Sequence, residues 1–83
     1  RWWKMRIKLK IIEPEKIVVQ EDADEVGLMT REGSLGILQG HVPLAAHLKE
    51  GEVTFVKGQK KESVRIKGGF ARILPDSVTG FTY

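Results

Sequence analysis

The chain has 83 residues and a formal net charge of +3, with basic and acidic residues mixed along its length. That length allows one small domain, and so mild and mixed a charge does not indicate a nucleic-acid-binding protein. The absence of cysteine excludes disulfides, thiolate metal sites and thiol catalysis. No apolar run approaches the roughly 18 residues of a membrane span, so we expect an intracellular protein without direct membrane insertion.

The first regular pattern is a strict alternation of apolar and basic side chains over residues 5–12. It predicts a half-buried strand with a basic outer face. Because Met5 is a plausible natural start, we assign residues 5–83 to one domain and residues 1–4 to an N-terminal extension. Trp2 and Trp3 with their flanking cations also suggest a membrane-surface anchor, although four residues are too few for an amphipathic helix.

An acidic cluster follows the second predicted strand. Residues 13–16 form a turn fixed by Pro14, and residues 17–19 are β-branched throughout, as in a short strand. Residues 21–25 read Glu-Asp-Ala-Asp-Glu, and carboxylates this close together could bind calcium. The cluster lacks the alternating ligands, central glycine and distal glutamate of a calcium loop, so we expect a solvated loop.

The middle of the chain contains glycines among large aliphatic residues. Residues 26–30 predict a third strand with Val26 and Leu28 facing inward. Residues 32–44 then combine three glycines with five aliphatic side chains, which predicts a buried, sharply bent strand rather than a flexible linker. Its polar residues would face outward from a rigid frame; they are Glu32, Ser34, Gln39 and His41.

The second half of the chain contains the clearest hairpin. Residues 52–57 pair with residues 62–67 across a lysine-rich tip that discourages edge pairing. The side chains expected to face inward are Val53, Phe55, Val64 and Ile66. Residues 43–48, before this hairpin, are ambiguous between a strand and a helical turn.

The chain closes with two further strands. Gly68 and Gly69 reverse the chain or form a bulge. Residues 70–74, with Phe70 facing inward, and residues 78–83 are strands separated by a turn that contains a proline. About eight to ten short strands and no helix indicate an all-β fold, a small two-sheet sandwich or flattened barrel.

An ordered set of short motifs resembles the N-terminal β-sandwich of the epsilon subunit of F-type ATP synthases. The motifs are Glu32-Gly33, Leu35-Gly36-Ile37-Leu38, Gly40-His41 and Pro43-Leu44, with Leu48-Lys49-Glu50-Gly51 and Gly68-Gly69-Phe70 later in the chain. The resemblance covers residues 5–82. The family often has proline at the place of Gln39 and an acidic residue at the place of Ser34.

The resemblance implies a non-catalytic rotor subunit of the central stalk. Such a subunit docks on the gamma subunit and on the membrane rotor (c) ring, and it couples ion-driven rotation to ATP synthesis without a cofactor or a small-molecule substrate. It lies at the cytoplasmic face of the bacterial inner membrane or the stromal face in a chloroplast. The implied ring contacts are Glu32, Ser34, Gln39, Gly40 and His41, and the implied structural turns are Gly33, Gly36, Pro43, Gly68 and Gly69. The family's C-terminal helical hairpin, which can inhibit ATP hydrolysis, has no counterpart in this sequence.

Other chemistry finds little support in the sequence. A zinc site needs three or four ligands, and the chain has only His41 and His47 and no cysteine. Ser34 lies seven positions before His41, but no motif places it on a nucleophile elbow. The glycines are not followed by the Gly-Lys-Ser/Thr of a phosphate loop. We therefore expect no metal and no catalytic residue.

A second interpretation is a small basic β-barrel that binds single-stranded nucleic acid. A basic patch could come from Lys57, Lys60, Lys61, Arg65 and Lys67. Such proteins also need exposed aromatic side chains. Phe55 and Phe70 occupy positions expected to face inward, which favours the rotor-subunit interpretation.

Overall fold

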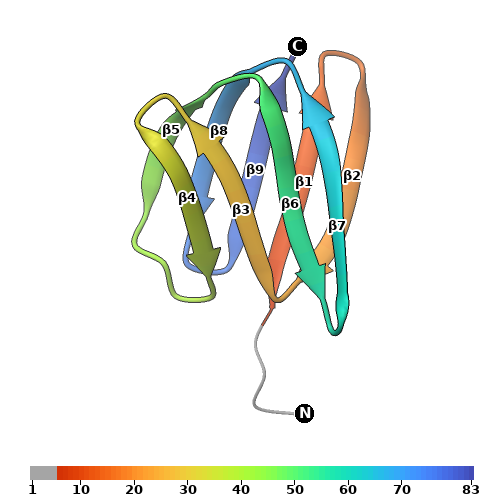
Figure 1. The fold of residues 1–83 in the computed structure, drawn as a ribbon, viewed down its shortest axis with the longest axis vertical. Coiled ribbons are helices and arrows are strands. Elements are labelled where there is room, and N and C mark those ends of the chain that lie inside the picture. Colours follow the sequence, from red (N-terminus) through yellow and green to blue (C-terminus); the bar gives the residue numbers. More distant parts are fainter. Residues whose placement is uncertain (1–5) are drawn as a thin grey trace.

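The computed structural model describes residues 6–83, which form nine β-strands and no helix (Figure 1). The strands are β1 (Ile7–Glu13), β2 (Lys16–Ala23), β3 (Glu25–Thr30), β4 (Gly33–Leu38), β5 (Leu44–Leu48), β6 (Gly51–Lys57), β7 (Lys60–Ile66), β8 (Gly69–Leu74) and β9 (Ser77–Thr82). The all-β prediction is confirmed, and residues 43–48 take the extended alternative as β5. No helix that could cross a membrane occurs in the described part of the chain. The predicted extension at residues 1–4 lies outside the described residues.

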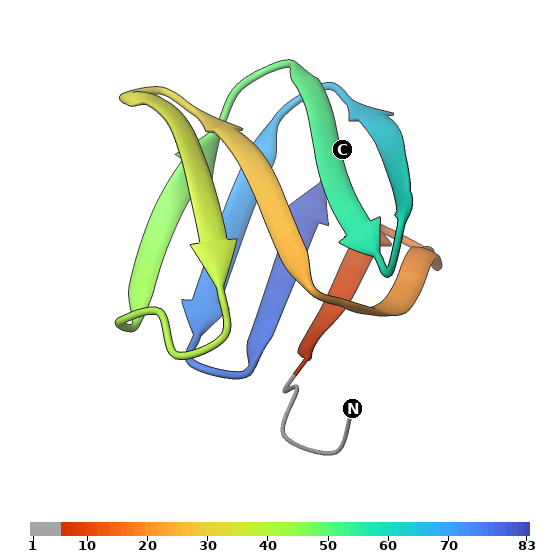
Figure 2. The same ribbon diagram turned by 60° about the horizontal axis from the view of Figure 1, so that its bottom comes forward.

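The strands form one sheet that curls over into two layers (Figures 1 and 2). One layer has the order β2-β1-β9-β8-β5, and the other has the order β4-β3-β6-β7. The layers join where Thr30 of β3 pairs with Leu48 of β5. Beside this pair the Arg31 amide donates to the His47 carbonyl at 3.1 Å, and the Lys49 amide donates to the Met29 carbonyl at 3.0 Å. Among the strands of residues 6–83, β1 and β9 are the one parallel pair; the other pairs are antiparallel, as in a half-barrel closed mainly by hairpins.

The core lies between the two layers and is built from every second residue of the strands. Inward positions of most strands contribute to it: Ile7, Leu9, Ile11, Val26, Leu28, Ile37, Val53, Phe55, Ile73 and Val78 are buried. Burying each large side chain contributes about 1.5–3 kcal/mol. The predicted inward residues of β3 and β6 are therefore confirmed, as is Ile66 on β7, and Val64 packs half-buried against the core.

The prediction of a solvated loop at residues 21–25 was wrong. Glu21 and Asp22 belong to β2, opposite Leu9 and Lys8 of β1, and Glu25 begins β3. Glu21 has a partner far away in the sequence that can hold its carboxylate on this strand: the Lys57 ammonium lies 2.6 Å from a Glu21 carboxylate oxygen. That hydrogen bond and the charge of the carboxylate raise the pKa of Lys57 above its usual value.

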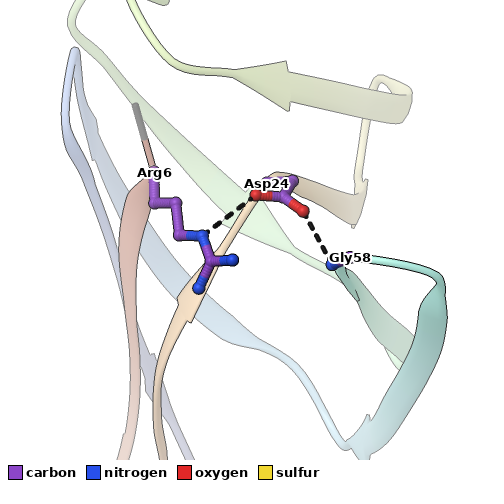
Figure 3. A network of polar contacts seen from close by, with 3 residues as sticks. All are labelled: Arg6, Asp24 and Gly58. Carbon is purple, nitrogen blue, oxygen red and sulfur yellow. Dashed lines mark hydrogen bonds and ion pairs between the residues drawn. The ribbon is translucent and has the colours of Figure 1, made fainter. Parts of the chain in front are cut away.

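Asp24 forms the bend between β2 and β3 and ties three segments together (Figure 3). Its carboxylate accepts a hydrogen bond from the Gly58 amide at 2.7 Å and lies 3.3 Å from Nε of Arg6. Its own amide donates to the Val56 carbonyl at 2.7 Å. The acidic cluster is therefore held by partners that are distant in the sequence. No group of three or more metal-ligating side chains occurs within residues 6–83.

Phe70 does not face inward as predicted; its side chain is 41% exposed. In β8 the buried positions are Ala71 and Ile73, so Phe70 and Arg72 share the outer face. Arg72 decides this phase, because burying an unpaired guanidinium costs more than the roughly 1.5–3 kcal/mol that burying a large apolar side chain returns.

Four of the five predicted structural turns lie at strand ends. Gly33 opens β4, Pro43 precedes β5, and Gly68 and Gly69 stand at the junction of β7 and β8. Gly33, Gly68 and Gly69 all have φ between +126° and +141°. The turn predicted at Gly36 is absent, since Gly36 lies in the middle of β4, opposite Gly27.

Candidate interaction surface

The residues predicted to contact the rotor ring fall into two groups at opposite ends of β4 (Figure 1). Glu32 and Ser34 lie at the hairpin between β3 and β4, whereas residues 39–41 lie in the loop between β4 and β5. At about 3.4 Å per residue, Ser34 and Gln39 are about 17 Å apart along the strand. A partner that touches both groups must therefore lie along β4 and not meet a single tip.

Side-chain and backbone hydrogen bonds fix the hairpin end. The Thr30 hydroxyl donates to the Gly33 carbonyl at 2.7 Å and accepts from the Glu32 amide at 3.2 Å. The two-residue turn is thereby closed through a half-buried hydroxyl. Glu32 and Ser34 project from it into solvent, as predicted.

The loop end is held against the turn between β8 and β9. The Gly40 amide donates to the Pro75 carbonyl at 2.7 Å, and the His41 amide donates to the Leu38 carbonyl at 3.2 Å. The His41 ring lies with Nδ1 2.7 Å from the Val42 carbonyl. Because a carbonyl can only accept, Nδ1 carries the hydrogen in this contact. His41 is thus half-buried and oriented, whereas Gln39 and Gly40 are exposed.

A shallow groove of about 370 Å³ runs between the hairpin end of β4 and β5. It is lined by residues 30–35 on one side and residues 44–47 on the other. In the described part of the chain β4 pairs with β3 alone, so its second edge is open beside this groove. An open edge leaves backbone amides and carbonyls available to a partner.

The aliphatic residues of the segment 32–44 are more exposed than predicted. Of the stretch expected to be buried, Ile37 is buried and Leu35 is half-buried, but Leu38, Val42 and Leu44 are exposed, Val42 at 69%. The reason is that an edge strand and its loop have one neighbour instead of two. The surface therefore combines exposed aliphatic side chains with polar ends, which suits protein–protein contact better than a ligand pocket.

Catalytic and metal-binding arrangements are not assembled among the described residues. His41 lies in the loop after β4, whereas His47 is on β5 with its ring edge-on to Phe70, at a centroid distance of 5.4 Å and an interplanar angle of 75°. Ser34 and His41 lie at opposite ends of β4, too far apart for a nucleophile and its base.

The basic patch proposed for nucleic acid lies on the β6–β7 hairpin, where part of its charge is neutralised. Lys57 pairs with Glu21, and Arg65 lies 3.6 Å from Glu50. Lys60 and Lys61 remain exposed at the tip. The exposed phenylalanines lie in the other layer, so the fold does not bring this patch and the aromatic rings together.

Sequence reasoning missed a second surface, on the outer face of the β2-β1-β9-β8-β5 layer. Cross-strand partners there form one line of five side chains, called the apolar row below: Ile17, Ile12, Phe81, Phe70 and His47. Four of its members are exposed and Ile12 is half-buried. The sequence signal that could have revealed this surface is Arg72: if Arg72 faces outward, Phe70, two residues earlier on the same strand, faces outward as well.

Comparison with known proteins identifies the family. Residues 6–81 match the family described as the ATP synthase, Delta/Epsilon chain, beta-sandwich domain. The chain belongs to this family. The match confirms the resemblance to the epsilon-subunit β-sandwich and covers β1 to β8 in full and β9 up to residue 81.

Individual relatives agree with this assignment. The chain is 45% identical to the ATP synthase epsilon chain of Syntrophobacter fumaroxidans over 74 residues, which are 89% of this chain and 55% of the relative. It is 40% identical to that of Bacillus subtilis over 73 residues, 88% of this chain and 55% of the relative. The chain thus spans about half the length of the curated relatives it matches.

A solved structure shares the fold. A chain of the Euglena gracilis mitochondrial ATP synthase, in a structure of OSCP, F1 and c-ring, superposes with a TM-score of 0.85 at 29% identity. The match covers 93% of this chain and 50% of that one. The two-layer arrangement described above is therefore shared with a chain from a rotary ATP synthase.

Proposed function

We propose that this domain is part of a non-catalytic central-stalk subunit of an F-type ATP synthase. In this proposal it docks on the gamma subunit and the c-ring and helps to couple ion-driven rotation to ATP synthesis. The observation that carries the proposal is the family match over residues 6–81, together with relatives that are named epsilon chains. Its location would be peripheral, at the cytoplasmic face of the bacterial inner membrane or the stromal face of a chloroplast membrane.

The physical properties of the domain support an adaptor role. Two packed layers with an apolar core form a stiff body, and the pockets among the described residues are open surface grooves. The rotor ring would meet the surface along β4, with Glu32 and Ser34 at one end and residues 39–41 at the other. The exposed aliphatic residues between them would add apolar contact area.

The two ends of β4 allow a sharp test of the ring assignment. We would prepare Ser34→Lys, His41→Asp and the double variant in the full epsilon subunit and measure recovery of the c-ring and ATP-driven ion pumping. A partner lying along β4 makes each single variant defective and the double variant worse. Lys60→Glu, at the far hairpin tip, is the control for a surface charge change. Unchanged assembly and coupling in the double variant would show the ring assignment to be wrong.

One observation favours the alternative, binding of single-stranded nucleic acid. Phe70 and Phe81 form an exposed cross-strand pair, whereas the sequence analysis expected no such pair. Binding of a fluorescent oligothymidylate, measured as a function of salt concentration, separates the two functions. Tight binding that weakens steeply with salt would favour the alternative.

A further inference from the structure

A shallow polar groove of about 630 Å³ lies on the outer face of β1, between β2 and β9 (Figure 1). It is called the β1–β9 groove below and is lined by residues 8–10 of β1, residues 20–22 of β2, and Ser77 and Thr79 of β9. Ser77 and Thr79 lie at the start of β9, whereas Phe81 of the apolar row lies near its end. The groove therefore occupies the polar end of this outer face.

The parallel pairing of β1 with β9 places two lysines beside two hydroxyl groups. The register sets Lys8 opposite Ser77 and Lys10 opposite Thr79. Neighbouring strands are about 4.8 Å apart, and residues i and i+2 of a parallel strand are about 6.6 Å apart, so the four side chains start from a rectangle of this size. Lys8 is exposed and the other three are half-buried. Four hydrogen-bond donors thus emerge from one small area on one face of the sheet.

These four side chains are available to a bound molecule. None of them has a hydrogen-bond or ion-pair partner within residues 6–83. The Gln20 amide, opposite Lys10 on β2, adds a further donor to the groove.

The charges around the groove are unevenly distributed. Glu21 is neutralised by Lys57. Asp22 lies opposite Lys8 on the side away from β9, and Asp76 lies in the turn before β9, so both remaining carboxylates are near the Lys8 end. Arg72 is the cross-strand neighbour of Thr79 on its other side. The end formed by Lys10 and Thr79 is therefore the more positive end of the groove.

This donor set matches a phosphate group. A phosphate monoester carries a charge of about −1.5 to −2 near neutral pH and has three acceptor oxygens, which suits two ammonium groups and two hydroxyls. The flexible lysine stems allow both ammonium groups to converge on one anion. A carboxylate, with one charge and two oxygens, would leave part of the donor set unused. A divalent cation would meet the two lysines and be repelled.

We propose that the β1–β9 groove binds the phosphate group of a phosphorylated small molecule or of a lipid headgroup. Lys8 and Lys10 would neutralise the phosphate, and Ser77 and Thr79 would orient it. Because the groove is shallow and its donors are open to water, we expect inorganic phosphate itself to bind in the millimolar range. This inference does not depend on the proposed function, since the β4 surface is in the other layer.

The test is a titration of the full chain with sodium phosphate, followed by amide NMR and compared with sodium chloride of equal ionic strength. The Lys8 amide, which donates to the Asp76 carbonyl, reports directly on this end of the sheet. Lys8→Gln with Lys10→Gln should weaken binding at least about tenfold, because it removes two charge-assisted hydrogen bonds. Ser77→Ala with Thr79→Val leaves the charge unchanged and should weaken binding about fivefold through two neutral hydrogen bonds.

Two matched controls separate a built site from a generally basic surface. Lys60→Gln with Lys61→Gln removes the same charge at the β6–β7 tip. Ser63→Ala with Thr54→Val removes two opposed hydroxyls on the outside of the other layer. Both controls should bind phosphate like the wild type. All these variants should retain the wild-type circular dichroism spectrum, since none of the changed side chains is buried.

Vesicles separate the two sources of the phosphate. Phosphatidic acid presents a phosphate monoester, whereas phosphatidylserine gives a charged surface without one. Sedimentation with phosphatidic acid vesicles, but not with phosphatidylserine vesicles, that is lost in both groove variants would support the headgroup. Saturable binding of inorganic phosphate without vesicle binding would support a soluble phosphorylated molecule.

Three results would overturn the inference. The first is the absence of saturable binding of both inorganic phosphate and phosphatidic acid vesicles. The second is wild-type phosphate binding in the hydroxyl variant, which would indicate only diffuse attraction by lysines. The third is binding of oligothymidylate through the groove without binding of phosphate, which would assign it to nucleic acid. None of these results bears on the proposed function, whose failure is seen in recovery of the c-ring.

Discussion

Gly69 is the position where a single methyl group should do most damage to this fold. It opens β8 opposite Thr82 of β9 and has φ of +141°. A Cβ atom placed there would lie 2.1 Å from the Phe81 carbonyl oxygen and 2.9 Å from the Thr82 Cα. Both are backbone atoms, so no side-chain rotation can relieve the contact and the β8–β9 pairing must shift.

The magnitude follows from two terms. An L-residue held in this region costs about 1–3 kcal/mol, and forcing an added group into a packed site costs about 1–3 kcal/mol. Their sum, about 2–6 kcal/mol, compares with a total stability of about 4–12 kcal/mol at the usual free energy per residue. At about 4–8 °C per kcal/mol for a small domain, we expect Gly69→Ala to lower Tm by at least about 8 °C or to prevent folding.

Gly36→Ala is the matched control for this substitution. Gly36 also lies in a strand, but its φ is ordinary and a Cβ atom there would meet nothing within 4 Å. Alanine should be neutral or stabilising by about 0.5–1 kcal/mol, because glycine in a strand is entropically costly. Urea and thermal unfolding followed by circular dichroism measure both variants. Equal unfolding midpoints for the two would refute the close approach of β8 to the β9 backbone.

Three further predictions concern the core and the polar ties. Phe55→Ala should reduce the free energy of unfolding by about 3–5 kcal/mol, as for a buried aromatic residue; a urea titration checks this, and a loss below about 1 kcal/mol would contradict the packing. Asp24→Ala removes the charged acceptor of the Gly58 amide, and losing a hydrogen bond to a charged group should cost about 1.5–3 kcal/mol in the same assay; Arg6→Ala, at the exposed partner, should cost less. Glu21→Gln tests the raised pKa of Lys57. That pKa is higher in the folded state, so its stabilisation is complete below the unfolded value near 10.4 and is lost as pH rises through the folded value. The urea midpoint of the wild type should therefore fall above about pH 10.4 more than that of Glu21→Gln; parallel curves would contradict the pairing.

The strands with one clear alternation could be predicted from the sequence. In β6 and β7 the buried or half-buried inward side chains are Val53, Phe55, Val64 and Ile66 and the outward ones are mostly polar, so only one phase buries an apolar face. In β8 either face could be buried, because Phe70 and Leu74 are apolar on one face and Ala71 and Ile73 are apolar on the other. The correct phase follows only when the cost of burying Arg72 is weighed against the gain from burying Phe70.

Features that depend on distant neighbours could not be predicted. The exposure of Leu38 and Val42 follows from β4 being an edge strand, and edge position is a property of the whole sheet order. The ordering of the acidic cluster depends on Lys57 and Gly58, which are more than 30 positions away in the chain. The distance between Ser34 and Gln39, in contrast, could be predicted, because the sequence predicted a strand between them and the number of residues in a strand sets its length.

The two surfaces meet at the junction of β3 and β5. His47 contributes to the groove beside β4 and, through its ring, to the apolar row on the outer face of the next layer. Its carbonyl accepts from Arg31, the residue after β3, and the adjacent Leu48 is buried in the core. If the c-ring binds along β4, force from it reaches the other layer across this junction, through backbone hydrogen bonds and buried side chains. These contacts deform little because the protein interior is close-packed. The contacts that close the half-barrel would therefore also hold the two layers rigidly relative to each other.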